Sequence, residues 1–259
     1  MFSTLFDPLS LRSLAIEARC EFLRLLRAPG FSVPTLLFPL LSYLLFGIAL
    51  GGGSRAGYHA SHYLLASYSV FGVISPALFG FGVSVALERE RGLLRLKRAL
   101  PMPPANYLLA KLFMAMLFAV LIFFAMSLLA VLTAGVRLEV SQWIGLASVA
   151  ILGVIPFCAL GLFIGSWVNG QAAAAVVNMI YLPMAFMAGL AIPLFLLPQV
   201  LQSIAPIWPA YHLAQLAQAA IGQPSLGSVS NHILVLGGFA IVAFVAARRR
   251  MSRVDAVSA

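Results

Sequence analysis

Charged side chains are scarce in this sequence. Only 9% of its 259 residues are Asp, Glu, Lys or Arg, while 62% are hydrophobic. A soluble domain carries about 25% charged residues, so this composition excludes an ordinary soluble fold and is typical of a membrane protein. The charge is also of mostly one sign, with 16 Lys and Arg against 7 Asp and Glu. Because the basic residues adjoin apolar runs, they indicate cytoplasmic loops and not a nucleic-acid surface.

Motifs for catalysis and metal binding are missing as well. Cys20 and Cys158 are far apart and neither belongs to a CxxC pair, so we expect neither a disulfide framework nor a zinc site. The sequence has no GxxxxGK[ST] phosphate loop, no HExxH motif and no GxSxG elbow. We therefore expect a chain that is not an enzyme and binds no cofactor. His212 beside Tyr211 is interpreted as interfacial packing, since no acid or nucleophile lies near it in sequence.

Long apolar runs dominate what is present. A helix needs about 20 apolar residues to cross a bilayer. Six segments without Asp, Glu, Lys or Arg meet this length, and they predict an all-α integral membrane protein with six transmembrane helices: 31–50, 62–87, 112–134, 142–168, 172–198 and 231–247. The fifth contains Pro183, Gly189 and Pro193, so it is expected to cross only to about Gly189 and then turn back.

The basic residues predict the orientation. Fourteen of the 16 fall before the first span, between the second and third, or after the sixth; only Arg55 and Arg137 fall on the other side. Cytoplasmic loops are enriched in Lys and Arg, so both termini are expected in the cytoplasm and the chain in the cell (inner) membrane. The first thirty residues have no long apolar core, which argues against a cleavable signal peptide.

Residues 1–30 are predicted to form a cytoplasmic amphipathic helix. Asp7 and Pro8 are typical of a helix start, and Pro29-Gly30 of a helix end. Apolar residues recur between them at spacings of three and four, while the charged residues of this surface helix include Glu17, Glu21 and Arg24. Such a helix lies along the membrane surface near anionic lipid headgroups. A simple topology anchor is an equally good interpretation.

Residues 189–230 form an unusual segment because they contain no Asp, Glu, Lys or Arg. An ordinary external loop of this length would be charged. The segment carries Pro193, Pro198, Pro206 and Pro209 together with Trp208 and Tyr211, and Trp and Tyr favour the headgroup zone. We predict short re-entrant helices in the outer leaflet, sheltered by protein so that their backbone ends are satisfied.

The expected absence of charge inside the bundle argues against an ion- or proton-coupled transporter, which usually keeps ionisable residues there. Mild polar residues remain, and a path lined by them would suit an amphipathic or lipid-like substrate. The candidates are Ser42, Tyr43, Ser67, Tyr68, Asn178 and Tyr181. Hydrogen bonds between neighbouring helices are the alternative interpretation. Gly161 and Gly165 form a small-xxx-small pair that permits close helix contact.

The stretch 87–112, LERERGLLRLKRALPMPPANYLLAKL, holds eight of the 23 charged residues. A topology signal needs only Lys and Arg, because acidic residues contribute little to it. Glu88 and Glu90, interleaved with Arg89 and Arg91, therefore suggest specific pairing with a cytoplasmic partner or with the N-terminal helix. Local ion pairs on a solvated face are the alternative. Gly92 is a plausible joint between the span and a surface helix of about 88–104.

These residues also carry a resemblance. ERERGLLRLKRALPMPPANYLLAKL resembles the E-R-E-x-G…L-P…A-K stretch of ABC-2-type permeases, the membrane subunits of bacterial ABC exporters. YLPMAFMAGLAIPLFLLPQVLQSIAPIWPAYHLAQL is similar to the same family from the fifth span onward. The resemblance covers most of the chain, but Leu93 stands where Thr or Ser often follows the glycine. It implies that the coupling element for a separate ATPase includes Glu88, Arg89, Glu90, Gly92 and Arg95.

The resemblance completes the functional hypothesis. The chain is expected to be the permease subunit of an ATP-binding cassette exporter for a drug-like, lipid-linked, peptide or polysaccharide substrate. ATP and Mg belong to the partner ATP-binding subunit. A second permease copy, identical or paralogous, and membrane lipid are the other expected partners, and nucleic acid is not one. The expected units are the helix 1–30, the membrane domain 31–247 and the basic tail 248–259. A membrane scaffold without transport activity is the alternative.

Overall fold

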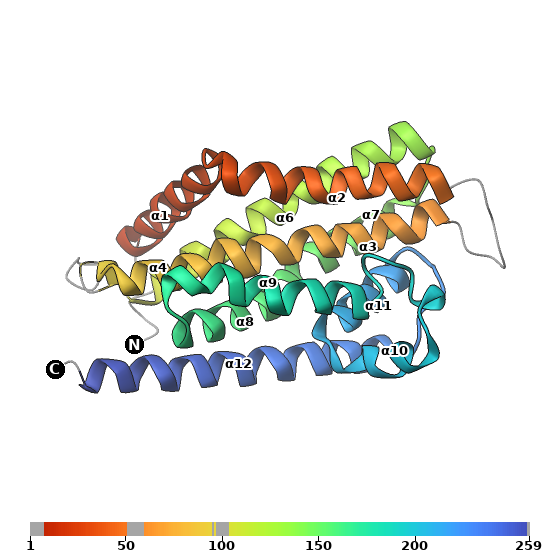
Figure 1. The fold of residues 1–259 in the computed structure, drawn as a ribbon. Coiled ribbons are helices and arrows are strands. Elements are labelled where there is room, and N and C mark those ends of the chain that lie inside the picture. The colour runs from red at the N-terminus through yellow and green to blue at the C-terminus, as the bar shows by residue number, and fades with distance from the viewer. Residues whose placement is uncertain (1–7, 51–59, 95, 97–103, 258–259) are drawn as a thin grey trace.

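The computed structural model of the chain describes residues 8–50, 60–94, 96 and 104–257 (Figure 1). Over these ranges all regular structure is helical, which agrees with the all-α expectation. Six candidate membrane spans occur among them, as predicted: Pro29–Phe46, Ala60–Glu90, Ala105–Ala134, Val140–Trp167, Gly170–Met187 and Val229–Met251.

The helices follow one another through the bundle, and several spans are built from more than one of them. In chain order they are α1 Pro8–Leu26, α2 Pro29–Leu50, α3 Ala60–Ser75, η1 Pro76–Val83, α4 Ser84–Glu90, α6 Pro104–Ala134, α7 Val140–Leu152, α8 Val154–Trp167, α9 Gly170–Met187, η2 Leu194–Leu196, α10 Gln199–Ile204, η3 Ala205–Ile207, α11 Pro209–Ala220 and α12 Val229–Val257.

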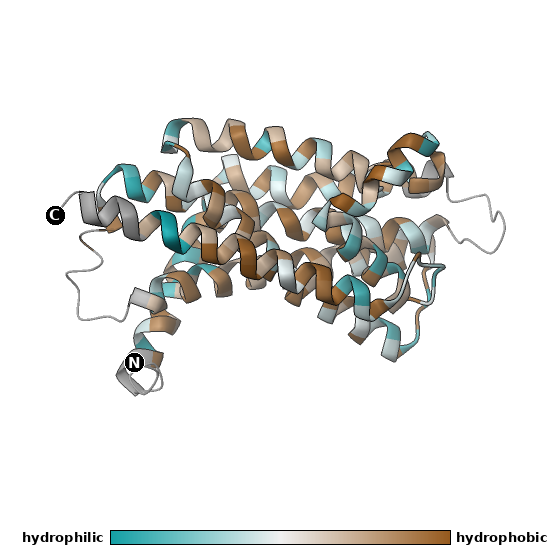
Figure 2. Ribbon diagram, turned by 90° about the horizontal axis from the view of Figure 1, so that it is seen from below, coloured by the Kyte–Doolittle hydropathy of each residue, from teal (hydrophilic) through white to brown (hydrophobic). Residues whose placement is uncertain are grey.

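The two ends of the bundle differ in character. Figure 1 shows α1, α4 and the C-terminal end of α12 at one end, and α10 and α11 at the other. Hydrophobic residues dominate the middle of the bundle, while hydrophilic ones gather toward its ends (Figure 2). This pattern is expected of helices that cross an apolar layer, because charged side chains are costly there.

The second span is one composite helix of α3, η1 and α4. Its middle element, η1, is a π-helix, with wider turns than the α-helices on either side. A Cβ atom added to Gly82 would lie 2.7 Å from the Cα atom of Gly161, and one added to Gly165 would lie 2.6 Å from the carbonyl oxygen of Gly82. The predicted close contact at Gly161 and Gly165 is therefore confirmed, and its partner is η1.

The fourth span is divided at Gly153, which separates α7 from α8. A Cβ atom at this position would lie 2.4 Å from the end of the Leu213 side chain, so α11 packs closely against this glycine. This contact brings α11, which belongs to the segment between the fifth and sixth spans, into the bundle. Nine of its twelve residues are buried.

The fifth span ends at Met187, close to the expected turn at Gly189 and well before residue 198. Gly189 has a φ of +78°, a left-handed conformation that favours glycine. Tyr68 of α3 then donates a hydrogen bond to the carbonyl oxygen of Ala191 at 3.1 Å. The short helices η2, α10, η3 and α11 follow, which confirms the prediction that residues 189–230 contain short helices.

The N-terminal helix α1 packs against α6 through its apolar side. The rings of Phe22 and Phe118 are 5.0 Å apart, and Ala18 is buried. Helix α1 ends at Leu26, three residues before the predicted stop at Pro29, and Pro29 itself begins α2. The expected helix cap at Asp7 lies outside the described residues.

Candidate functional site

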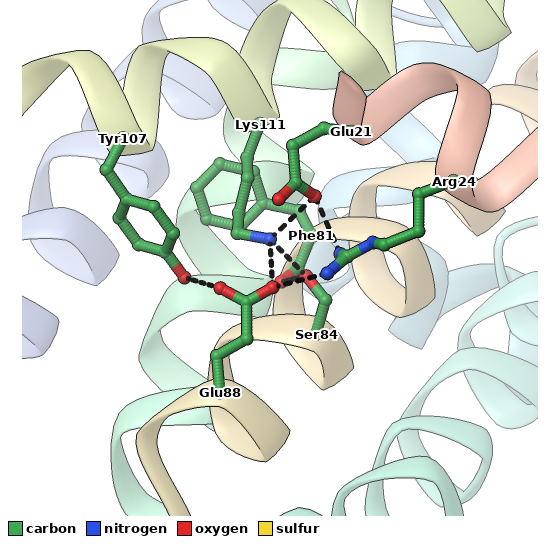
Figure 3. A network of polar contacts seen from close by, with 7 residues as sticks. All are labelled: Glu21, Arg24, Phe81, Ser84, Glu88, Tyr107 and Lys111. Atoms are coloured by element: carbon green, nitrogen blue, oxygen red, sulfur yellow. Dashed lines mark hydrogen bonds and ion pairs between the residues drawn. The ribbon is translucent and has the colours of Figure 1, made fainter. Parts of the chain in front are cut away.

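A cluster of ionised side chains lies where α1, α4 and α6 meet (Figure 3). Its centre is Lys111 of α6, whose side chain is fully buried. The Lys111 Nζ atom donates to Glu21 Oε2 at 3.0 Å, to Glu88 Oε1 at 2.9 Å and to Ser84 Oγ at 2.9 Å. One ammonium group therefore joins a carboxylate of α1 to a carboxylate of α4.

Arg24 and Tyr107 complete the cluster. The Arg24 guanidinium donates to Glu21 Oε2 at 2.6 Å and to Glu88 Oε1 at 2.8 Å, and the Tyr107 hydroxyl donates to Glu88 Oε2 at 2.7 Å. Partial burial opposes the charge of Arg24, but Glu88 and Glu21 outweigh it and raise the pKa of Arg24. Two cations thus face two anions, and we call Glu21, Arg24, Ser84, Glu88, Tyr107 and Lys111 the ion cluster.

Helical spacing explains how the sequence assembles this cluster. Glu21 and Arg24 are three residues apart on α1, Ser84 and Glu88 are four apart on α4, and Tyr107 and Lys111 are four apart on α6. Residues at these spacings share one helix face. Burying charge is expensive unless each ion is paired and hydrogen-bonded, and here each carboxylate has at least two donors. The cluster therefore fixes the three helices relative to one another.

The expectation of an uncharged bundle is wrong at this end. The candidate spans extend to Glu90 and begin at Ala105, so they include Glu88 and Lys111. The sequence predicts Lys111 in the loop between the second and third spans and Glu21 on a surface helix, whereas the structure buries both. Of its two candidate partners for Glu88, the structure shows the N-terminal helix, and the solvated-face interpretation is wrong for this residue. The four-residue spacing of Ser84 and Glu88, which places both on one helix face, was the feature of the sequence that could have indicated the inward position of Glu88.

The remaining residues of the charged stretch point elsewhere. Arg89 donates hydrogen bonds to the carbonyl oxygens of Ser166 and of Val168, the latter at 2.8 Å, and so satisfies the C-terminal end of α8. Glu90 is exposed at the end of α4, and its carboxylate lies against Gly170, the first residue of α9. Negative charge is favourable at a helix N-terminus.

Helix α4 stops at the predicted joint. Arg91 is exposed, and Gly92 has a φ of +71°, the left-handed conformation that commonly ends helices. Glu88 and Glu90 therefore belong to the end of the second span and not to a separate surface helix. Arg95 and residues 97–103, which cover much of the expected coupling helix, lie outside the described residues.

The residues predicted for the N-terminal surface helix divide between two environments. Glu17 is half-buried and Arg24 is about half exposed, whereas Glu21 is buried in the ion cluster. Helix α1 thus contributes to the interior of this end of the bundle through one acidic residue that periodicity alone did not assign inward.

The six candidate path residues are not gathered in one place. Asn178 and Tyr181 line a groove of about 360 Å³ between α2, the α3–η1 region and α9, together with Thr35, Phe38 and Ser75. Tyr43, Ser67 and Tyr68 are buried and bond within the bundle; Ser67 accepts from Gln218 at 3.1 Å. Ser42 is half-buried on α2. Ser67 and Tyr181 thus bond to neighbouring helices, Tyr68 bonds to the segment after α9, and the groove contains Asn178 and Tyr181.

Fold and site together define a multi-pass helical membrane protein with its buried charge at one end. A family model described as ABC-2 type transporter matches residues 14–221. Because this match covers most of the sequence, the chain belongs to that family. It is also 27% identical over 198 residues to "Putative transport permease YvfS" of Bacillus subtilis (strain 168), across 76% of this chain and 80% of the relative. The chain is thus a membrane permease, a transport subunit and not a catalytic one.

Within the described residues, no group of three or more His, Cys, Asp or Glu side chains is placed to hold a metal ion. The ion cluster is held together by its own cations, Arg24 and Lys111. The role of the ion cluster is structural, because its ion pairs connect α1, α4 and α6.

Proposed function

We propose that the chain is the permease of an ATP-driven exporter, working with a separate ATP-binding subunit and a second permease copy. The family match carries the proposal, since an ABC-2 type membrane domain has no phosphate-binding loop of its own and depends on a partner for ATP. The expected substrate is amphipathic: drug-like, lipid-linked, peptide or polysaccharide. ATP and Mg²⁺ would bind to the partner. We place both termini in the cytoplasm of a cell whose inner membrane holds the chain.

The contact with the ATP-binding subunit is proposed at the end of α4. Glu90 and Arg91 are exposed there, and Gly92 follows as a joint. A force applied to this end would be transmitted, because Glu88 is tied to both α1 and α6 through Arg24 and Lys111. The proposed coupling element therefore has an outer part, Glu90 and Arg91, and an inner part, the ion cluster.

The proposed substrate path runs along the groove that contains Asn178 and Tyr181. Its lining combines the rings of Phe38, Phe71 and Tyr181 with hydroxyl and amide groups, which suits a ligand that is mostly apolar with a few polar groups. The Phe71 and Tyr181 rings are stacked at 5.1 Å, and the Tyr181 hydroxyl donates to the Phe71 carbonyl oxygen at 3.0 Å. Asn178 is exposed on α9 and available to a ligand or to the second copy.

Charge reversal at Glu90 tests the coupling contact. We expect Glu90→Arg to insert and express normally, with a small loss of stability because Glu90 also lies at the start of α9, but to lower substrate-stimulated ATP hydrolysis or co-purification of the ATP-binding subunit. A mismatched charge at a partly buried interface costs roughly 2–5 kcal/mol. Arg137→Glu is the matched control, because it reverses an exposed charge in the connection between α6 and α7, far from α4 in sequence and at the opposite end of the bundle.

Two results would count against the proposal. If Glu90→Arg retains full coupling, the contact lies elsewhere. If the wild-type chain recruits no ATP-binding subunit and stimulates no ATP hydrolysis in lipid, the alternative of a membrane scaffold gains support.

A further inference from the structure

Two histidines meet at the far end of the bundle from the ion cluster. His212 of α11 and His232 of α12 have their Nδ1 atoms 2.8 Å apart, a hydrogen-bond distance. Each ring also uses its other nitrogen. His212 Nε2 lies 2.9 Å from the carbonyl oxygen of Pro206, and His232 Nε2 lies 2.8 Å from the carbonyl oxygen of Leu226. Both side chains are about 95% buried.

Counting protons over these contacts gives an unusual result. A carbonyl oxygen can only accept, so His212 Nε2 and His232 Nε2 must each carry a hydrogen. A neutral imidazole has one N–H, so both Nδ1 atoms would then be bare and two lone pairs would face each other. The 2.8 Å contact therefore needs one further hydrogen between the Nδ1 atoms. Three ring hydrogens on two imidazoles give the pair a charge of +1.

We propose that His212 and His232 form a binding site for one proton, shared between their Nδ1 atoms, and that this proton fastens the outer segment to the start of α12. The ligand is the hydrogen ion of the medium on that side of the membrane. The proposal stands apart from the ATP-dependent function, because it concerns a proton bound by this chain alone.

Few other ionisable groups surround the histidine pair. The sequence has no Asp, Glu, Lys or Arg between residues 189 and 247, which include all of α11 and the first 19 residues of α12. Tyr211, whose ring contacts both histidines, is the titratable neighbour, and burial raises its pKa further from neutrality. The elements packed against α11 and α12 add His62, Tyr63 and Tyr68 on α3, Cys158 on α8 and Tyr181 on α9.

The shared proton has a defined mechanical effect. Pro206 lies in η3 and Leu226 lies in the connection between α11 and α12, so the two rings tie both segments to the α11–α12 junction. The Leu226 peptide is held from its other side as well, since its N–H donates to Gln215 Oε1 at 2.7 Å. Without the shared proton only two ring hydrogens remain for the three contacts, which are Nδ1–Nδ1, His212–Pro206 and His232–Leu226. One of these hydrogen bonds must then be lost.

A second proton is also unfavourable. Burial lowers the pKa of His212 and so opposes any protonation of the ring, although the hydrogen bond to Pro206 raises it; the charge of His232 lowers it further. Two adjacent imidazolium rings would in addition lose the Nδ1–Nδ1 hydrogen bond. The outer segment should therefore be most firmly held at intermediate pH, and loosen on both the acid and the alkaline side.

Nitrogen NMR of the full chain in lipid, with ¹⁵N-labelled histidine, tests the proton directly. We expect a nitrogen–nitrogen coupling across Nδ1–H···Nδ1 that is present near neutral pH and lost in wild type at high pH. His62→Gln should leave it unchanged, whereas His232→Gln should abolish it. Independent titration of His212 and His232 without any coupling would overturn the proposal. A signal removed by a chelator or shifted by added Zn²⁺ would also overturn it, in favour of a metal site.

Hydrogen exchange of the backbone tests the mechanical effect. The glutamine in His232→Gln can still donate to Leu226 but cannot take up a proton. At each pH we divide the exchange rate of the backbone amides at 205–208 and 226–228 in wild type by the rate in His232→Gln. We expect this ratio to be lowest at intermediate pH. His212→Gln should behave like His232→Gln, and His62→Gln like wild type. A ratio that does not change with pH would contradict the proposed fastening, even in variants that fold well.

Discussion

Lys111 of α6 and Glu88 of α4 form an ion pair of 2.9 Å with both side chains buried, 23 residues apart in a chain that is otherwise almost uncharged in its spans. Tyr107 of α6 and Arg24 of α1 bind the same carboxylate, so Glu88 is held by three side chains from two other helices. The end of α4 that we propose to meet the ATP-binding subunit is thus anchored immediately behind its exposed residues.

Removing Lys111 should be more damaging than removing it together with Glu88. In Lys111→Met the cluster keeps two anions and one cation, and breaking a buried ion pair on one side costs about 3–5 kcal/mol. In the double variant Lys111→Met, Glu88→Gln, one anion and one cation remain. We expect the thermal unfolding midpoint in detergent to fall in the single variant and to recover in part in the double variant. Equal midpoints for the single variant and wild type would show that the cluster contributes nothing.

The contact between η1 and α8 should not tolerate a methyl group. Gly82→Ala would place Cβ 2.7 Å from the Gly161 backbone, so the helices must separate. Overpacking of this kind typically costs 1–3 kcal/mol. Gly238→Ala in α12 is the control, because a Cβ there has no atom within 4 Å. We expect a lower unfolding midpoint for Gly82→Ala alone, and the same midpoint in both variants would refute the packing argument.

The outer segment should be shielded from water. Leu216 is half-buried in α11, whereas Val200 in α10 is 69% exposed in the isolated chain. If lipid or a second copy covers this segment, cysteines at both positions should react slowly with a membrane-impermeant thiol reagent, in a background without Cys20 and Cys158. A cysteine at the exposed position Arg137 provides the fast reference. Labelling at Val200 as fast as at Arg137 would indicate an ordinary solvated loop.

Reporter fusions test the orientation. Most basic residues lie at the end of the bundle that holds α4 and the C-terminal part of α12, so this end should face the cytoplasm. A reporter fused after Arg250 should give a cytoplasmic signal, and one fused after Arg137 an external signal. The reverse pattern would contradict both the orientation and the proposed ATPase contact.

The sequence predicted the layout of this protein well because membrane spans depend mainly on length and apolar composition. Its six spans, the end of the fifth near Gly189 and the joint at Gly92 all agree with the structure. The inward position of Glu21 and Lys111 was not predicted. In the sequence Lys111 looks like a topology charge and Glu21 like a charge on a surface helix, and only the packing of α1 on α6 shows that the two pair directly. The histidine pair was missed for a related reason, since 20 residues and a helix reversal separate its members.

The π-helix η1 affects which residues of α4 face the ion cluster. A turn closed by i→i+5 hydrogen bonds encloses one more residue than an α-helical turn, so rotation lags behind residue number across Pro76–Val83. The inward-facing positions of α3 consequently do not continue into α4 at the spacing that an uninterrupted helix would give. The π-helix therefore changes the direction in which the side chains of α4 point around the helix axis. Ser84 and Glu88 are the residues of α4 that face Lys111. The register of the charged end is therefore set inside the membrane, by an apolar stretch that contains no charge itself.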